Sequence, residues 1–131
     1  MLHCYYDCAQ KDRFEKLFGN LWIGKHPTPH RNNYQVLFLD FSQITGNIDV
    51  LEERFNSYLN INLDWFVRTY SDYYPKETQE EIFSKKVCDE KFELIFKTAK
   101  ANNYSLYLII DEYDTLPMWC LMSMERVCTM P

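Results

Sequence analysis

An apolar run that ends in acidic residues is the feature that most constrains how this chain can fold. Residues 106–110 are all apolar or aromatic, and Asp111, Glu112 and Asp114 follow them closely. A run of this length without polar alternation predicts a strand buried on both faces, as in the middle of a parallel sheet flanked by helices. Ligands of such sheets bind at the carboxyl ends of the strands, so we expect these acids to stand at a ligand site.

A second run earlier in the chain repeats this pattern. Residues 34–39 are mostly apolar, and Asp40 and Ser42 stand at the end of the run. The two runs are separated by a long connection rich in helix signals, which is the arrangement of a βαβ unit with a right-handed crossover. We therefore predict an α/β fold in which two parallel strands, at about 35–41 and 105–111, form a sheet flanked by helices.

The connection and the amino-terminal segment carry helix patterns. Asn47 is predicted to cap a helix with an apolar stripe at spacings of three and four. Thr78 fits the start of a capping box for a second helix, which breaks near residues 87–88. A helix is also predicted over residues 2–18, and residues 25–33 are predicted to form a surface loop. The apolar stripe comprises Ile48, Leu51, Phe55, Leu59, Leu63, Phe66 and Tyr70.

Composition and charge narrow the function classes. The chain has 131 residues, of which 47% are hydrophobic, and this is enough for one core and one domain. Its formal net charge of −5 gives no electrostatic basis for direct nucleic-acid binding. No apolar run approaches the roughly 20 residues that span a bilayer, and no secretory signal opens the chain. We therefore expect a cytoplasmic protein without membrane contact.

The cysteines indicate neither disulfides nor a metal centre. There are five of them, an odd number scattered along the chain, and this does not suggest a disulfide framework. His3, Cys4 and Cys8 come nearest to a metal cluster, with Cys4 and Cys8 on one face of the predicted helix. A fourth ligand would be needed. We interpret them as small buried residues of an amphipathic helix and assign no metal.

The acid pair after the second strand has the form of a Walker B segment. In that segment an Asp at the strand end holds Mg²⁺, and an adjacent Glu polarises a hydrolytic water. Asp111 and Glu112 occupy these positions. The simpler alternative for this pair is a solvated strand end. For Asp40 and Ser42 the alternative is a cap on the following turn.

With both strands placed, the chain resembles the bacterial AAA-ATPase-like domain. That domain is a P-loop ATPase, usually joined to a C-terminal nuclease domain of the restriction-endonuclease type. The resemblance covers residues 1–115, and the matching segments are residues 4–7, 14–18, 21–24, 36–42 and 108–114. It implies a partial P-loop NTPase-like sheet and a function in ATP binding and hydrolysis with Mg²⁺ as cofactor.

The resemblance also implies roles for the acidic residues. Asp111 would bind Mg²⁺ through a water, and Glu112 would be the catalytic base that orients the attacking water. Asp114 would accept a hydrogen bond that fixes the loop after the strand. Asp40 and Ser42 would support this site from the neighbouring strand or contact the water.

Two departures from the family pattern shape the functional expectation. The 131 residues contain no Gly-x-x-x-x-Gly-Lys-Ser/Thr motif, the Walker A loop that binds the β- and γ-phosphates. Residues 116–131 diverge from the pattern, so we divide the chain into an internal domain fragment at 1–115 and a divergent tail. We expect a truncated or mispredicted reading frame without the P-loop segment and the nuclease domain. Such a fragment would be inactive and would bind neither ATP nor Mg²⁺ by itself.

Two other function classes remain open. The chain is alternatively a non-catalytic remnant or a protein-interaction module without nucleotide binding, which associates through the sheet edge left by a missing strand. The acids are alternatively part of a metal nuclease core. That core places a Lys two residues after its second acid, whereas Asp114 stands there in this chain, so it is the least favoured class.

Overall fold

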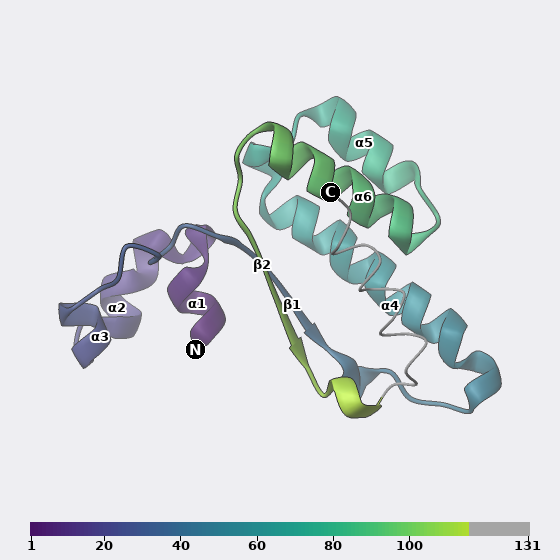
Figure 1. The fold of residues 1–131 in the computed structure, drawn as a ribbon, viewed down its shortest axis with the longest axis horizontal. Coiled ribbons are helices and arrows are strands. Elements are labelled where there is room, and N and C mark those ends of the chain that lie inside the picture. The colour runs from purple at the N-terminus through teal and green to yellow at the C-terminus, as the bar shows by residue number, and fades with distance from the viewer. Residues whose placement is uncertain (116–131) are drawn as a thin grey trace.

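The computed structural model describes residues 1–115 and has the α/β architecture that the two apolar runs predict. Strands β1 (Gln35–Asp40) and β2 (Leu106–Asp111) pair in parallel, with Gln35 opposite Leu106 and Asp40 opposite Asp111. The two strands run side by side between the amino-terminal helices and the later helices (Figure 1). The predicted strand positions are confirmed to within one residue.

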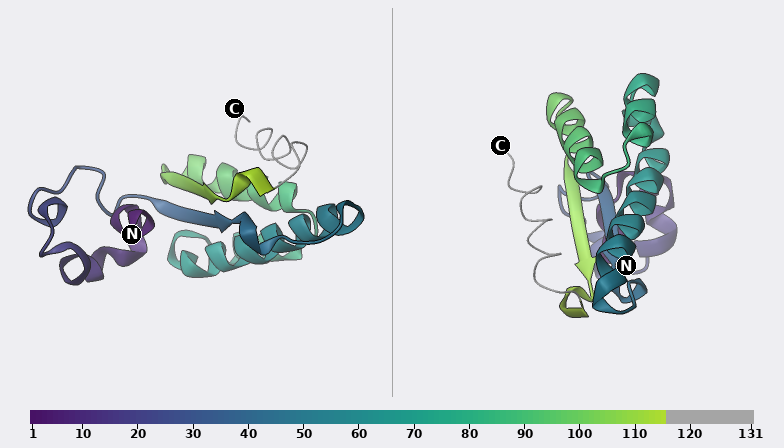
Figure 2. Two further views of the ribbon diagram at one scale, coloured as in Figure 1. Left: turned by 90° about the horizontal axis from the view of Figure 1, so that it is seen from below. Right: turned by 90° about the vertical axis from the view of Figure 1, so that its right-hand side faces the viewer.

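Three helices connect the strands and cover one face of the sheet. Helices α4 (Ile48–Thr69), α5 (Lys76–Ser84) and α6 (Cys88–Ala101) lie together on that side of the strand pair (Figures 1 and 2). The main core lies between these helices and the strands. Each large apolar side chain buried there contributes roughly 1.5–3 kcal/mol. The largest fully buried side chains are Leu39, Phe41, Leu59, Leu63, Val67 and Ile82.

The apolar stripe predicted for α4 is confirmed except at its start. Its buried members are Leu51, Phe55, Leu59, Leu63, Phe66 and, at the C-cap, Tyr70. Ile48 is exposed because the first turn of α4 lies away from the strands (Figure 1). Asn47 occupies the N-cap position as predicted, although its side chain makes no capping hydrogen bond.

The capping box predicted at Thr78 is wrong. Helix α5 begins at Lys76, with Pro75 at the N-cap, so Thr78 lies inside the first turns. The carbonyl of Pro75 accepts the backbone N–H of Gln79 at 2.9 Å. Because the fixed φ of proline suits the start of a helix, the chain enters the helix earlier than the capping box predicts.

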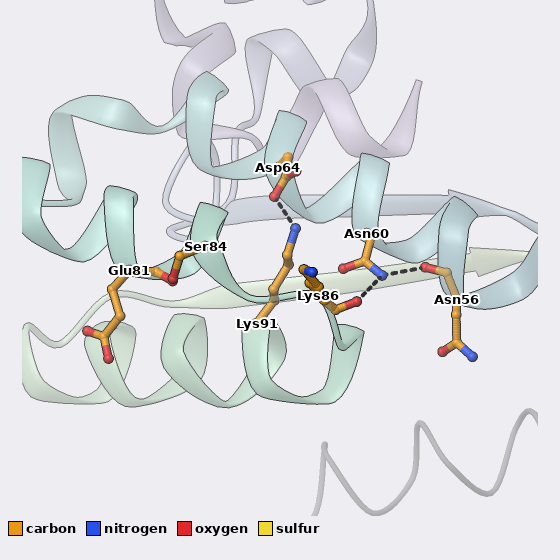
Figure 3. A network of polar contacts seen from close by, with 7 residues as sticks. All are labelled: Asn56, Asn60, Asp64, Glu81, Ser84, Lys86 and Lys91. Atoms are coloured by element: carbon orange, nitrogen blue, oxygen red, sulfur yellow. Dashed lines mark hydrogen bonds and ion pairs between the residues drawn. The ribbon is translucent and has the colours of Figure 1, made fainter. Parts of the chain in front are cut away.

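Polar contacts join α4 to α6 and to the segment that precedes it (Figure 3). Lys91 Nζ of α6 lies 2.7 Å from Asp64 Oδ1 of α4, and the Lys91 side chain is only 5% exposed. Asn60 Nδ2 of α4 donates to the carbonyl of Lys86 at 3.2 Å. Lys86 lies in the break between α5 and α6, which confirms the break predicted near residues 87–88.

The helical character predicted over residues 2–18 is confirmed, but the segment does not form a single helix. The segment divides into α1 (Leu2–Tyr6), the 3-10 helix η1 (Cys8–Arg13) and α2 (Phe14–Phe18), and α3 (Trp22–Lys25) follows. Asp7 interrupts it with extended backbone, and its Oδ1 accepts the backbone N–H of Ala9 at 2.8 Å. Asp7 also forms a parallel bridge with Tyr34, just before β1. This pairing replaces hydrogen bonds that a continuous helix would make.

Two tyrosine hydroxyls cover the outer edge of β1. Tyr70 accepts the backbone N–H of Val36, and Tyr58 accepts that of Asp40, both at 2.9 Å. In a parallel ladder alternate N–H groups point to opposite sides, and these two face away from β2. Side chains from α4 and its C-cap therefore take the hydrogen bonds that another strand would make at this edge.

The two-sided burial predicted for β2 is wrong for the part of the chain that the structure describes. Residues 106–110 are all half-buried, whereas Leu39 of β1 is fully buried. Within residues 1–115, β1 is the only strand that pairs with β2. The second edge of β2 therefore receives no cover from another described strand.

The surface loop predicted at residues 25–33 is confirmed from residue 26 onward, since α3 includes Lys25. The predicted tail at 116–131 lies outside the described residues, and the domain division at residue 115 stays a prediction. No helix within residues 1–115 is both long enough and apolar enough to cross a membrane.

Candidate functional site

The acids predicted at the two strand ends meet at one edge of the sheet. Asp40 ends β1 and Asp111 ends β2, and they are register partners on adjacent parallel strands. Neighbouring strands lie about 4.8 Å apart, so the two side chains start from adjacent backbone positions. The chain continues from these ends into η2 (Phe41–Gln43) and η4 (Tyr113–Thr115), close together in Figure 1. We call this edge the acidic rim.

Asp40 caps the turn that follows β1. Its Oδ1 accepts the backbone N–H of Ser42 at 3.0 Å, so Asp40 is the N-cap of η2. Hydrogen bonds from the side chain and the backbone of Ser42 lower the pKa of the Asp40 carboxyl. The capping role left open for Asp40 and Ser42 is therefore present. Because a carboxyl with a lowered pKa is ionised at neutral pH, Asp40 also places a negative charge on the rim.

Tyr58 is a rim contact that the sequence did not predict. Its hydroxyl accepts the backbone N–H of Asp40, and burial raises the pKa of this hydroxyl. Tyr58 lies three residues after Phe55 on α4, where helical periodicity indicates packing against the core. No local pattern signals a hydrogen bond to a strand end 18 residues earlier in the chain.

The chain turns sharply at Glu112. The Oδ1 atom of Asp111 accepts the backbone N–H of Glu112 at 3.0 Å, and Glu112 has a φ of 55°. Left-handed backbone costs a residue with a β-carbon roughly 1–2 kcal/mol. The turn leads directly into η4, which contains Asp114. Asp111, Glu112 and Asp114 are all exposed at the rim.

The strand-end carboxylates of the rim would hold a cation only as a shared site, with further ligands from outside the rim. Within residues 1–115, no three His, Cys, Asp or Glu side chains are grouped so that they could hold a metal ion together. The rim offers two neighbouring strand-end aspartates. Mg²⁺ is commonly bound by one or two carboxylates together with waters and substrate phosphates. The residues present therefore fit a Mg²⁺ ion that arrives with phosphate groups.

The amino-terminal cysteines do not form the shared face predicted for them. Cys4 lies in α1 and Cys8 in η1, and the extended backbone of Asp7 separates the two helices. Burial raises the pKa of the Cys8 thiol, which keeps it protonated at neutral pH. Cys8 is therefore a partly buried structural residue.

A parallel sheet flanked by helices, with acids gathered at its carboxyl edge, defines this chain as an α/β protein. A family model described as AAA-ATPase_like, predicted AAA-ATPase, matches residues 1–129. The chain therefore belongs to the AAA-ATPase-like family, as the sequence resemblance implied. No curated protein and no solved structure matches the chain.

Proposed function

We propose that this chain carries the Walker B segment of a domain that binds and hydrolyses ATP with Mg²⁺. The observation that carries the proposal is the in-register pairing of Asp40 and Asp111 at the carboxyl edge of a parallel sheet. The family match over residues 1–129 supports the same activity. In this proposal Asp111 holds Mg²⁺ through a water. Glu112 orients the attacking water and accepts its proton.

The other rim residues assist this pair. The charge of Asp40 strengthens the attraction of the rim for a cation, and hydrogen bonds from Ser42 lower the pKa of that carboxyl. Asp114 would support the turn after β2 as a further acceptor, beside the hydrogen bond from the Glu112 N–H to Asp111 Oδ1. Each of these side chains leaves the chain within a few residues of a strand end.

The missing Walker A motif limits what the chain does alone. The 131-residue sequence contains no Gly-x-x-x-x-Gly-Lys-Ser/Thr motif, the pattern of the loop whose N–H groups and Lys hold the β- and γ-phosphates. We therefore propose that these residues act as an internal fragment of an ATPase domain, without ATPase activity by themselves. The P-loop segment and a C-terminal nuclease domain are the proposed partners in cytoplasmic full-length relatives.

A paramagnetic ion tests the rim directly. Mn²⁺ accepts the same oxygen ligands as Mg²⁺, and its unpaired electrons broaden NMR signals close to it. We expect Mn²⁺ to broaden the backbone amide signals of residues 40–42 and 111–114 first. Asp111→Asn should remove this selectivity. Asp72→Asn removes the same charge from the exposed 3-10 helix η3 (Ser71–Tyr73) and should leave the rim signals broadened as before. Equal effects of the two variants would contradict a site at Asp111.

Titration with Mg²⁺ and ATP tests the proposed inactivity of the chain. We expect calorimetry to detect no saturable binding at micromolar nucleotide, because the phosphate-binding loop is missing. Saturable binding that disappears in Asp111→Ala would overturn the inactivity while supporting the rim as the site.

A non-catalytic remnant or interaction module is the second candidate. It is favoured by one observation, that the apolar residues of β2 are half-buried while β2 pairs with a single strand among residues 1–115. An unpaired strand edge is a template for association with another chain. The genomic DNA upstream of Met1 distinguishes the two candidates. An in-frame Gly-Lys-Ser or Gly-Lys-Thr supports a misassigned start of an ATPase, and its absence supports a remnant.

A further inference from the structure

The loop between α3 and β1 lines an open pocket of about 460 Å³. This pocket lies at the end of the sheet opposite the acidic rim. The cavity is lined by Lys11 of η1 and by residues 27–29 and 31–33 of the loop. The loop leads directly into β1, and its place between α3 and β1 can be followed in Figure 1. Asp40 lies at the opposite end of β1 from this loop, roughly 17 Å from Gln35 at 3.3 Å per residue. The cavity and the rim are therefore separate sites.

The loop is held in shape by hydrogen bonds to the amino-terminal segment, where Tyr5, Phe14 and Phe18 form a small core of their own. The Tyr5 hydroxyl accepts the backbone N–H of Thr28 at 2.8 Å and lies 3.1 Å from Thr28 Oγ1. The backbone N–H of Asn32 donates to the carbonyl of Tyr5, and Asn32 Nδ2 donates to the carbonyl of Asp7 at 2.8 Å. Tyr5 and Asn32 are both buried. The cavity wall is therefore formed before any ligand arrives, which lowers the entropic cost of binding.

All the charge on the cavity wall has one sign. Lys11 and Arg31 line the cavity, and no acidic residue does. The guanidinium carbon of Arg31 lies 4.4 Å from the centre of the Phe14 ring, which is itself buried. Stacking on a fixed ring orients the planar guanidinium fork. The chain as a whole has a net charge of −5, so the wall of this cavity is positive although the chain is negative.

We propose that this cavity binds the phosphate group of a small phosphorylated compound. The Arg31 fork matches two phosphate oxygens at once, and Lys11 adds a compact positive charge on the neighbouring wall. The surrounding Thr28 and Asn33 supply uncharged polar surface for the rest of the ligand. The overall negative charge of the chain repels long polyanions, so an isolated phosphate is favoured over a nucleic-acid backbone.

The experiment uses the whole 131-residue chain and inorganic phosphate as the first probe, at low ionic strength. We expect saturable shifts of the backbone NMR signals of residues 27–33, with one phosphate bound per chain. Lys11→Gln and Arg31→Gln should each weaken phosphate binding at least tenfold. Arg31→Lys should also weaken it, because it keeps the charge and loses the fork. All three variants change exposed side chains, so each should remain folded, and thermal unfolding is the measurement that checks this.

The matched control is Lys16→Gln, which removes one exposed positive charge from α2 outside the cavity. It should change phosphate binding less than twofold. An equal loss in Lys16→Gln would show bulk charge attraction and overturn the site, as would shifts that fail to saturate. Ribose 5-phosphate should bind at least as tightly as phosphate. Tighter binding of a single-stranded oligonucleotide through the same residues would replace the small ligand with nucleic acid. Asp111→Asn should leave phosphate binding intact, so this test is independent of the rim.

Discussion

The hydroxyl of Tyr58 accepts the backbone N–H of Asp40 at 2.9 Å and so joins the middle of α4 to the last residue of β1. The Tyr58 ring also packs against Phe41, with 6.2 Å between ring centroids. Phe41 is fully buried and directly follows Asp40. The strand end that carries a rim carboxylate is therefore fixed from the helical side, although β1 has no second strand beside it within residues 1–115.

Tyr58→Phe tests this link. The variant keeps the ring packing and removes the acceptor, which leaves the Asp40 N–H without its partner. We expect a loss of about 1–2 kcal/mol in the free energy of unfolding, measured with urea. Amide hydrogen exchange at Asp40 should also become faster. Tyr113→Phe removes an exposed hydroxyl and should change stability by less than about 0.5 kcal/mol. Equal effects of the two variants would contradict the link.

Replacing Asp64 or Lys91, which form an ion pair, should lower the stability of the protein by different amounts. Lys91 is almost fully buried, whereas the Asp64 side chain is 28% exposed. Asp64→Leu leaves a buried ammonium without a partner and should cost about 3 kcal/mol. Lys91→Met leaves a carboxylate that water still reaches and should cost less. Restoring stability with the double variant, relative to Asp64→Leu, would confirm the cause by a double-mutant cycle.

The Cys88 thiol should react slowly with alkylating reagents. Burial raises its pKa from 9.0 to about 11, and its Sγ donates to Asn56 Oδ1 at 3.0 Å. At pH 8 the thiolate fraction is then about 100-fold below that of an unperturbed thiol, and alkylation should slow accordingly. Mass spectrometry of alkylated peptides measures this rate at Cys88. A rate equal to that of a small free thiol would contradict it.

The same pKa predicts a pH dependence of stability. Between pH 9 and pH 11 the unfolded thiol of Cys88 loses its proton while the folded thiol keeps it. The contribution is therefore complete below pH 9 and is lost as the pH rises toward 11. The difference in unfolding free energy between the wild type and Cys88→Ala should shrink over this range. A constant difference would show that the thiol does not retain its proton on folding.

Among substitutions of Glu112, a residue that tolerates left-handed backbone should preserve more stability than a β-branched residue. The φ of 55° at Glu112 is strained for Glu, and Asn adopts such backbone more readily. We expect Glu112→Asn to unfold at a higher temperature than Glu112→Val. Glu112→Val, with a β-branched side chain, should lose about 1 kcal/mol or more. Similar destabilisation by both would mean that the side chain of Glu112, and not its backbone, supports the fold.

Local patterns predicted the parts of this protein that repeat along the chain. The strands at 35–40 and 106–111 follow from apolar runs, and the buried stripe of α4 follows from spacings of three and four. In both patterns the spacing of apolar residues shows which side of an element faces the core, so residues close together in the sequence are enough to predict the element. The meeting of Asp40 and Asp111 followed as well, because parallel strands deliver their ends to one edge.

The sequence alone thus determined two parallel strands with acids at their carboxyl ends and the long helix that covers them. The tertiary structure decided the break at Asp7, where a bridge to Tyr34 outweighs local helix signals. It also decided the hydrogen bond from Asp40 to Tyr58 and the cavity beside Arg31. Each of these depends on groups that lie far apart in the chain and come together only when the chain folds. Local sequence patterns therefore do not predict these contacts.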